Sequence, residues 1–396
     1  MKALRIHAGP LARAHIERHG LQPQDIRLVA GAAGGPKGLI LGPLDRFVFG
    51  HWLPQADHPV HLLGASIGAW RMATAAMRDP AAAFARFERA YIHQHYEPEP
   101  GRRMPSPARV SQGFRQALDE FFASEVEGIL NHPRFRLHVV TTRGRHVLAR
   151  EGRLRTPAGY LGLALSNAVS RRALNLWAER VVFSSPGSSL PLDLGDLSSR
   201  RVALSAANFH DALQASCSIP FVLQAVHDIP GAPPGAYWDG GITDYHLHWR
   251  YRTLADALDA ALDRAASTAD ALIAATAPAS PSAGDDRGPD PAAGRLVLYP
   301  HFQRQLVPGW LDKVLKRRHR PTPDLDNVIV LAPDPDWVSR LPRGKLPDRN
   351  DFAFHGRDTG ARVRDWSRAV AEAQRISDEF VRWLDGGTPL ARVEPL

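Results

Sequence analysis

Residues 60–70 read VHLLGASIGAW. The apolar run that opens this stretch predicts a short buried strand, and the apolar spacing from Ile67 to Met77 predicts a helix. The same order occurs earlier in the chain: Asp25–Gly31 predicts a strand, a glycine-rich turn follows, and Leu39–Phe49 carries apolar residues at helical spacing. Two strand–turn–helix units predict an α/β fold with a largely parallel sheet.

Residues 64–68 match the G-x-S-x-G pattern of a nucleophilic serine between a strand and a helix. A sharp turn would hold Ser66 in a strained backbone, and Gly64 and Gly68 would let chain and substrate approach closely. A helix that begins at Ile67 would direct its first N–H groups and its dipole at a forming oxyanion. We expect Ser66 to be a nucleophile, and the alternative is a serine that caps a buried helix.

The glycine-rich turn, residues 31–38, reads GAAGGPKG. It departs from the phosphate loop of nucleotide-binding proteins, because Pro36 precedes the lysine and Gly38 stands where a serine or threonine would bind magnesium. It also departs from the dinucleotide pattern G-x-G-x-x-G, since Ala33 occupies the first glycine position. A backbone N–H cradle for an oxyanion fits better, and a plain tight turn is the alternative. Pro36 has no N–H. The remaining candidate donors are Gly34, Gly35, Lys37 and Gly38.

A third motif, Trp238-Asp239-Gly240-Gly241, reads as a strand end that runs into a tight turn. An aspartate in that position can present its carboxylate to a cleft. Asp239 would then take the proton from Ser66, the role that histidine usually has. An aspartate that only stabilises its own turn is the alternative.

These three motifs together resemble the patatin-like phospholipase family, whose marks are a glycine-rich oxyanion turn, a G-x-S-x-G elbow and an Asp-Gly-Gly/Ala turn, in that order. The segment Ala215–Phe221, ASCSIPF, also resembles the Ala-Ser-x-x-Ile-Pro segment of the family. The resemblance covers residues 26–248. Two departures stand out: Ala33 replaces the first glycine of the oxyanion turn, and the Asn-x-Pro often found after the aspartate is absent.

The resemblance implies a three-layer α/β/α fold with a mainly parallel central sheet and a Ser–Asp dyad without cofactor or metal. By this resemblance, Ser66 attacks a fatty-acyl ester, Asp239 accepts its proton, and an acyl-enzyme is hydrolysed, as in a phospholipase A. Gly34, Gly35 and Ile67 would hold the oxyanion. The remaining motif residues would support the turns or, for the lysine, face an anionic head group: Lys37, Gly38, Gly64, Gly68, Gly240 and Gly241.

Two pairs of histidines leave other chemistry open. His93 and His95, or His246 and His248, would lie on one side of a strand, but a metal site needs further ligands that the sequence does not indicate. His246 or His248 would alternatively complete a Ser–Asp–His triad, as in a carboxylesterase or thioesterase. A lipid-binding protein with an inert site is the third alternative.

The chain has 396 residues and a formal net charge of +8, which indicates an acidic partner, either nucleic acid or an anionic membrane. Its sharpest basic cluster, residues 313–320 (KVLKRRHR), follows Trp310, and basic side chains beside an indole favour an anionic membrane. A solvated basic helix end is the alternative. No motif indicates nucleic acid, so none is expected as a partner. The partner we expect is a phospholipid or other acyl-ester lipid, with membrane contact through Lys313, Lys316, Arg317, Arg318 and Arg320.

Location and organisation follow from composition. No stretch has signal-peptide or membrane-spanning character, and the single Cys217 excludes an internal disulfide, so we expect a cytoplasmic protein that contacts membranes peripherally. We expect four segments: an N-terminal helical lead-in (1–25), the catalytic core (26–264), a flexible Ala/Pro/Asp-rich insertion (265–294), and C-terminal strands and a helix that complete the same domain (295–396). The last helix shows an apolar face from Val363 to Trp383.

Overall fold

A computed structural model describes residues 2–102, 104–254 and 295–396, so the expected insertion at 265–294 lies outside the described residues. The described part contains one mixed sheet of eleven strands. Its main path runs in the order β11 (Val393–Pro395), β1 (Leu4–Ala8), β10 (Val328–Pro333), β9 (Leu296–Pro300), β2 (Ile26–Gly31), β3 (Val60–Ala65), β4 (Phe135–Gly144), β5 (Ala178–Ser184) and β6 (Ser199–Ala203). Most of the neighbouring pairs along this path are parallel.

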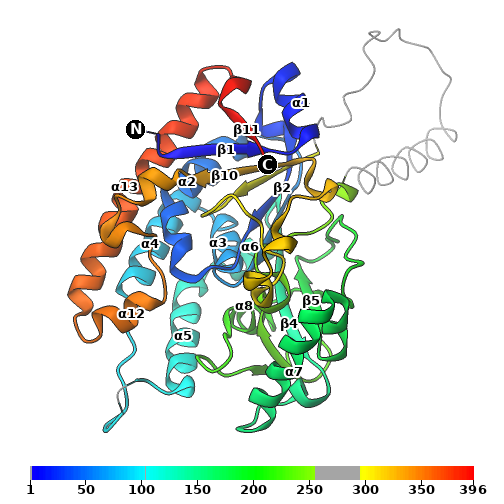
Figure 1. Ribbon diagram of the computed structural model, residues 1–396, viewed down its shortest axis with the longest axis vertical. Coiled ribbons are helices and arrows are strands. Elements are labelled where there is room, and N and C mark those ends of the chain that lie inside the picture. Colours follow the sequence, from blue (N-terminus) through cyan, green and yellow to red (C-terminus); the bar gives the residue numbers. More distant parts are fainter. Residues whose placement is uncertain (1, 103, 255–294) are drawn as a thin grey trace, which may run out of the picture.

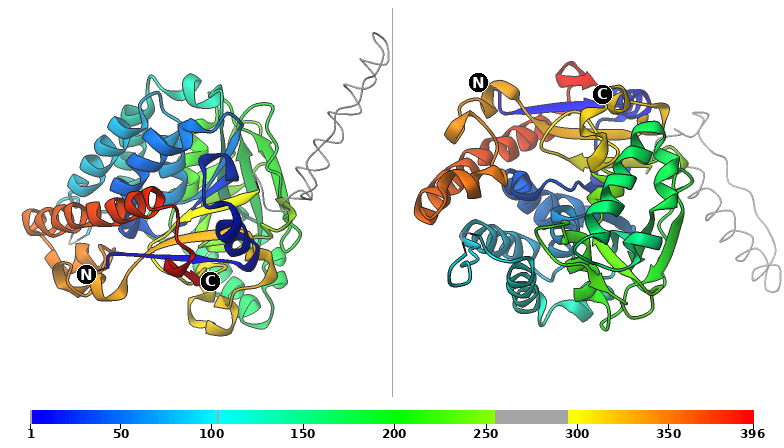
Figure 2. Two further views of the ribbon diagram at one scale, coloured as in Figure 1. Left: turned by 90° about the horizontal axis from the view of Figure 1, so that it is seen from above. Right: turned by 60° about the horizontal axis from the view of Figure 1, so that its bottom comes forward.

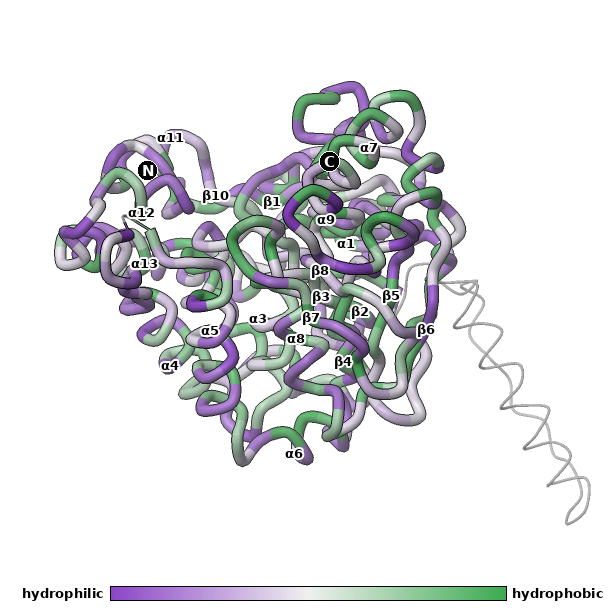
Figure 3. The backbone as a smooth tube through the Cα atoms, turned by 90° about the horizontal axis from the view of Figure 1, so that it is seen from below, coloured by the Kyte–Doolittle hydropathy of each residue, from purple (hydrophilic) through white to green (hydrophobic). Residues whose placement is uncertain are grey.

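The central strands are almost entirely buried, as the near-continuous apolar runs of parallel strands require. Figure 3 shows the hydrophobic colouring of β2, β3 and β4 through the middle of the molecule. Two short antiparallel strands extend the sheet beside β4: β8 (Ala236–Asp239) pairs with β4, and β7 (Val226–His227) pairs with β8.

Helices cover the sheet (Figures 1 and 2). Gathered on one side are α2 (Gly42–Phe47), α3 (Ile67–Ala75), α4 (Pro80–His93), α5 (Pro107–Phe122) and α13 (Thr359–Asp385). α7 (Arg155–Val169) lies on the other side. The other α-helices of the described residues are α1 (Pro10–His19), α6 (Val126–Leu130), α8 (Phe209–Cys217), α9 (Gly241–Asp244), α11 (Pro335–Val338) and α12 (Asn350–His355). The expected α/β fold with a mainly parallel sheet is confirmed.

The expected last helix is present as α13, whose apolar face packs on the helices of its own side. Phe380 is fully buried, and its ring centroid lies 6.2 Å from that of Phe47 and 5.7 Å from that of Trp52. The carboxylate of Asp358 accepts a hydrogen bond from the N–H of Ala361 and caps the helix. No helix among the described residues combines the length and apolarity that a membrane crossing needs.

Two local predictions were incomplete or wrong. Residues 1–25 contain the expected helix, α1, but they also contribute strand β1, which pairs with β10 and β11. The sequence of Arg145–Ala149 predicts a hairpin partner for the strand before it, and this prediction is wrong, because His146–Ala149 form a 3-10 helix. The long antiparallel partner of β4 is β5, whose seven residues are all buried.

The register of the sheet brings the three sequence motifs together. Gly31 at the end of β2 pairs with Gly64 on β3, and Ala65 on β3 pairs with Val140 on β4. One residue further along β4, Thr141 pairs with Asp239 at the end of β8. The glycine-rich turn, Ser66 and Asp239 therefore meet at the carboxyl ends of β2, β3 and β8. Open α/β sheets bind their ligands at the carboxyl ends of their strands.

Candidate active site

Ser66 lies on a sharp turn between β3 and α3, with backbone angles φ 56° and ψ −129°. A positive φ is costly for a residue with a side chain and persists only where the surroundings enforce it. The glycines on either side of Ser66 let neighbouring backbone pack closely enough to hold this conformation. A Cβ on Gly68 would lie 1.8 Å from the carbonyl oxygen of Gly31, and one on Gly64 would lie 2.5 Å from the Cα of Ala69. Helix α3 therefore packs directly against β2 and β3, and Ser66 projects from the turn.

The side chains of Ser66 and Asp239 form a direct, buried hydrogen bond. Ser66 Oγ donates to Asp239 Oδ2 at 2.7 Å, and the N–H of Gly241 donates to Asp239 Oδ1 at 2.7 Å. Both side chains are 6% exposed. The carboxylate is thus fixed by the turn that follows it, and its other oxygen is aligned with the serine hydroxyl.

Burial raises the pKa of Asp239 to about 6, against the opposing effects of the hydrogen bonds from Ser66 and Gly241 and the charges of Arg349 and Lys313. A carboxylate with a pKa near neutrality is a better proton acceptor than an exposed one, because its basicity is closer to that of the group it must deprotonate. The pair therefore has the contacts and the acidity of a nucleophile with its general base.

Backbone N–H groups at two helix starts lie beside Ser66. Gly35 is the first residue of the 3-10 helix Gly35–Leu41, and Ile67 is the first residue of α3. The first N–H groups of a helix have no partner inside it. The N–H of Ser66 is already used, because it donates to Ser216 Oγ at 2.9 Å. Gly34, Gly35 and Ile67 are therefore the candidate oxyanion donors around the serine.

Close packing explains how the glycine-rich turn accommodates an alanine. A Cβ on Gly34 would lie 2.3 Å from the ring of Phe302, so this position needs glycine. The methyl group of Ala33 is buried, and a Cβ on Gly241 would lie 2.7 Å from it. Gly241 therefore makes room for the methyl group that replaces hydrogen at Ala33.

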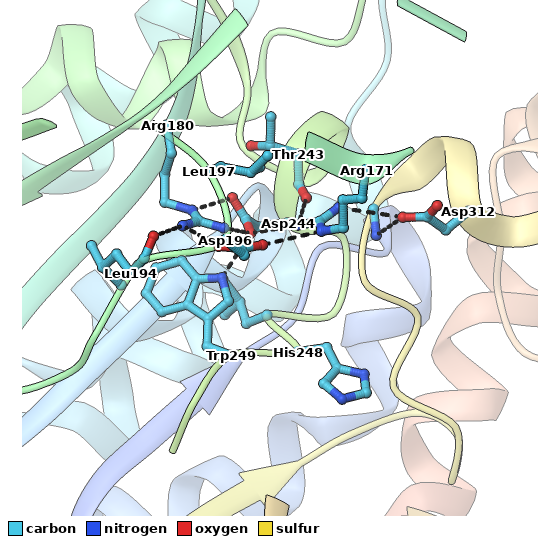
Figure 4. A network of polar contacts seen from close by, with 12 residues as sticks. Arg171, Arg180, Leu194, Asp196, Leu197, Thr243, Asp244, His248, Trp249 and Asp312 are labelled. Carbon is cyan, nitrogen blue, oxygen red and sulfur yellow. Dashed lines mark hydrogen bonds and ion pairs between the residues drawn. The ribbon is translucent and has the colours of Figure 1, made fainter. Parts of the chain in front are cut away.

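The turn after Asp239 is held by a buried polar network in place of the absent Asn-x-Pro (Figure 4). Asp244, the last residue of α9, accepts hydrogen bonds from Arg180 Nε at 2.7 Å and from Trp249 Nε1 at 2.7 Å. Arg171 Nη2 donates to the carbonyl oxygen of Thr243 at 2.6 Å. Arg180 and Asp244 are both fully buried. The network ties the short helix that carries Gly241 to β5.

His246 and His248, the two histidines considered for a triad, form other hydrogen bonds. His246 Nδ1 accepts a hydrogen bond from the N–H of Val307 at 3.0 Å, and His248 Nδ1 lies 3.0 Å from the carbonyl oxygen of Leu306. Within residues 2–102, 104–254 and 295–396, neither imidazole forms a hydrogen bond with Ser66 or Asp239, and no cluster of three metal-ligating side chains occurs.

Two adjoining cavities meet at Ser66. One, of about 270 Å³, is lined by the glycine-rich turn, Ser66, Asp239 and the cations Lys37, Lys313 and Arg349. The other, of about 80 Å³, is largely apolar and aromatic; its walls include Trp70, Tyr91, Tyr96, Val110, Phe114 and Leu223. Sequence reasoning missed Arg349 and Ser216. Only the Ala-Ser-x-x-Ile-Pro segment gave a signal for Ser216, and nothing in the sequence indicated Arg349.

Arg318 differs from the other cations of the basic cluster, and its position corrects the prediction that it contacts a membrane. Arg318 points inward: Arg318 Nη1 donates to Asp312 Oδ1 at 2.6 Å and Nη2 donates to the carbonyl oxygen of Asn167 at 2.9 Å. Its side chain is only 17% exposed, so it is no free surface cation. Lys313 lines the cavity at Ser66 and, like Lys316, Arg317 and Arg320, is exposed.

A protein-family model matches the segment of the chain that contains the three motifs. The family model for patatin-like phospholipase matches residues 32–246, which is more than half of the chain. The match runs from the glycine-rich turn to just beyond the Asp239 turn. No curated protein matches the chain.

Proposed function

This chain belongs to the patatin-like phospholipase family of lipid acyl hydrolases, and from this premise we propose that it cleaves a fatty-acyl ester, as a phospholipase A does, through a Ser66–Asp239 dyad. The observation that carries the proposal is the 2.7 Å hydrogen bond from Ser66 Oγ to a buried carboxylate at a strained strand-to-helix turn. This arrangement pairs a nucleophile with a base that is already aligned.

The proposed reaction has two steps. Asp239 takes the proton of Ser66 Oγ as the oxygen attacks the ester carbonyl, and the N–H groups of Gly34, Gly35 and Ile67 hold the oxyanion. The intermediate collapses to an acyl-enzyme, and the alcohol leaves with the proton that Asp239 returns. Asp239 then deprotonates a water molecule, which attacks the acyl group. As this second intermediate collapses, Asp239 returns the proton to Ser66 Oγ, and the fatty acid leaves.

The apolar cavity next to Ser66 supports an acyl substrate. It shares Gly35 and Ser66 with the catalytic cavity, and its aromatic wall includes Trp70 and Phe114, whose ring centroids lie 5.3 Å apart. Burial of methylene groups against such a wall would favour a hydrocarbon chain by about 0.8 kcal/mol for each group. We therefore assign the methylene groups next to the ester carbonyl to this cavity.

We further propose that the enzyme works in the cytoplasm as a peripheral membrane protein. Helix α7 carries three exposed apolar residues that follow one another at intervals of one helical turn. They are Leu161, Leu165 and Val169, which are 62%, 63% and 83% exposed. Asn167 on α7 binds Asp312, and the exposed Val314 follows with the cations Lys316 and Arg317. Apolar side chains flanked by cations suit an anionic bilayer surface.

Hydrolysis of short p-nitrophenyl esters tests the dyad. We expect Ser66→Ala and Asp239→Asn each to lower kcat/KM at least 10³-fold, while Asp385→Asn, which removes an exposed carboxylate at the end of α13, retains activity. Circular dichroism controls for folding. Activity in Asp239→Asn together with its loss in His246→Asn or His248→Asn would establish a histidine base in place of Asp239. Vesicle binding by a wild-type protein that turns over no acyl ester would indicate an inert lipid-binding protein.

A further inference from the structure

The apolar cavity beside Ser66 is small compared with a long acyl chain. Its volume is about 80 Å³. An apolar protein cavity of about 150 Å³ holds one benzene molecule, so the cavity beside Ser66 has room for roughly half as many carbon atoms, about three. The acyl chains of membrane lipids contain several times this number. The length of chain that the enzyme accepts therefore depends on whether the walls of this cavity can give way.

Buried side chains from three parts of the chain form the apolar wall. Trp70 lies on α3, one helical turn after Ser66, and Leu223 lies beyond the end of α8. Val110 and Phe114 lie one turn apart on α5, so both face the cavity. These four wall residues are at most 9% exposed and belong to the hydrophobic core. The wall is therefore part of the packed interior.

The Trp70 ring cannot move aside without disturbing other aromatic rings. Its centroid lies 5.2 Å from that of Phe87, 5.3 Å from that of Phe114 and 5.8 Å from that of Phe121. Protein interiors are packed as densely as organic crystals, and a change of volume by a single methylene group disturbs them. Trp70 is therefore a fixed part of the wall.

Hydrogen bonds join α5 to the segment that carries Leu223. The N–H of Gln224 donates to Ser111 Oγ at 2.8 Å, and Gln214 Nε2 on α8 donates to the carbonyl oxygen of Ser111 at 3.2 Å. Ser111 follows Val110 in the chain, and Gln224 follows Leu223. The wall is thus tied together beside these two apolar side chains, and a separation of α5 from this segment would break both hydrogen bonds.

Tyr96 closes another side of the cavity and rests directly on α5. A Cβ on Gly113 of α5 would lie 2.8 Å from the Tyr96 ring. Tyr96 Oη accepts a hydrogen bond from Gln94 Nε2, and the carbonyl oxygen of Gln94 accepts one from Nη2 of the buried Arg362 at 2.7 Å. Helix α13, which carries Arg362, therefore holds Tyr96 in place through Gln94.

The catalytic cavity is a poor substitute for a longer chain. The two cavities meet at Ser66 and Arg349, and Lys37 and Lys313 also line the catalytic one. An acyl chain that turned back towards these cations would remove water from charged groups without giving them a hydrogen-bond partner, which costs free energy. The alcohol part of the ester also has to lie on this side of Ser66.

We propose, on the basis of the proposed function, that the enzyme is selective for esters of short acyl groups and that Val110 helps to set their length. The acyl group has about four carbon atoms, namely the carbonyl carbon at Ser66 and about three in the apolar cavity. Val110 is the smallest of the four wall residues, so its volume can be changed in both directions. Esters with the long acyl chains of membrane phospholipids are then poor substrates.

A series of p-nitrophenyl esters tests acyl length, because the acetate, butyrate, hexanoate, octanoate and decanoate share one alcohol part. Each ester is used below its micelle concentration. We expect kcat/KM to rise from acetate to butyrate by about fourfold for each methylene group, since the cavity buries these groups. Between butyrate and decanoate kcat/KM should fall about tenfold or more, because a longer chain overpacks the cavity.

Two substitutions of Val110 are expected to shift this profile in opposite directions. Val110→Ala makes room for about two more carbon atoms, so the ratio of kcat/KM for hexanoate to that for butyrate should rise about tenfold. Val110→Phe fills the cavity, so the ratio of kcat/KM for butyrate to that for acetate should fall about tenfold. A general loss of structure would lower kcat/KM for all esters alike and would leave both ratios unchanged.

Val202→Ala is the matched control. Val202 lies on β6, is 8% exposed against 9% for Val110, and lines neither cavity at Ser66. Its profile should match that of the wild type. A wild-type kcat/KM that stays level or rises from butyrate to decanoate, or ratios that neither Val110 variant changes, would overturn the limit on acyl length while the proposed function stands. A folded wild type that hydrolyses none of the esters would overturn both.

Discussion

Burial of the Asp239 carboxylate lowers the stability of the folded protein and raises the basicity of this side chain. A buried carboxylate is costly when charged, and a pKa of about 6 in place of the usual value near 4 corresponds to roughly 3 kcal/mol against the charged form. The cost is limited by two hydrogen bonds, from Ser66 and from Gly241, and by the charges of Arg349 and Lys313. The remaining penalty makes the carboxylate basic enough to act near neutral pH.

This pKa predicts the pH dependence of the reaction. Below about pH 6 Asp239 is protonated and cannot accept the proton of Ser66, so kcat/KM for an uncharged ester should fall about tenfold for each pH unit. Above pH 6 the carboxylate is charged and the rate should reach a plateau. A pH–rate profile from pH 4 to 8 measures this, and a rate that stays constant down to pH 4 would rule out Asp239 as the base.

The sequence predicted the residues of the three motifs because each motif is local: a glycine, a serine or an aspartate at a fixed place in a turn. It did not predict the residues that reach the site over long sequence separations. Ser216 takes the N–H of Ser66 across 150 positions, and Arg349 lies 3.7 Å from the position of a Cβ on Gly35. These contacts depend on the position of α12 relative to the sheet. A local sequence pattern carries no information about that position.

At the scale of elements, the position of Ser66 depends on the close contact between α3 and β2. Gly68→Ala should force α3 away from the carbonyl oxygen of Gly31, since its Cβ would lie 1.8 Å from that oxygen. We expect a loss of at least 10²-fold in kcat/KM and a destabilisation of about 2 kcal/mol or more. Urea unfolding and ester hydrolysis measure both effects.

Gly128→Ala is the matched control for this variant. It places the same methyl group on α6, where nothing lies within 4 Å of the new Cβ. Alanine has the higher helix propensity, so stability should stay equal or rise by up to about 1 kcal/mol. Comparable losses in Gly68→Ala and Gly128→Ala would contradict the role of the α3–β2 contact.

The link between α9 and β5 gives a second prediction for an element. Removal of one partner from a buried ion pair leaves the other charge uncompensated, which costs about 3–5 kcal/mol. We expect Arg180→Met to destabilise the protein by this amount and to lower kcat, because α9 carries the Gly241 N–H that fixes Asp239.

The exposed pair Arg250–Asp193 offers the comparison. Its side chains are 42% and 47% exposed, and Arg250→Met should change stability by less than about 1 kcal/mol. Denaturant unfolding of both variants distinguishes the two environments. Equal stability of Arg180→Met and Arg250→Met would show that the network does not anchor α9.

For the whole molecule, the class of fold and the parallel strands were predictable from apolar runs, but the order of the strands was not. β9 lies between β10 and β2, although more than 260 residues separate β2 from β9 in the chain. Pairings of this kind come from tertiary packing, and a local period cannot reveal them. Since β9, β10 and β11 join the same sheet as the strands that carry the three motifs, we propose that the described residues of the expected segments 26–264 and 295–396 form one domain.

The apolar face of α7 and the neighbouring cations predict the orientation of the molecule on a bilayer. Leu161→Asp or Leu165→Asp should each weaken binding to vesicles of anionic lipid about tenfold, because a charge replaces an apolar contact with the acyl boundary. Leu11→Asp on α1, another exposed leucine, should bind like the wild type. Sedimentation with vesicles measures binding, and unchanged binding of both α7 variants would place the membrane contact elsewhere.

The central claim is that Ser66 is a nucleophile activated by Asp239, and covalent labelling tests it most directly. A fluorophosphonate probe transfers its phosphonyl group to an activated serine, and mass spectrometry of the digested protein identifies the modified residue. We predict one adduct for each chain, located on Ser66, absent in Ser66→Ala and formed at least 10²-fold more slowly in Asp239→Asn. An unlabelled Ser66 in the folded wild type, or labelling at an unchanged rate in Asp239→Asn, would contradict the claim.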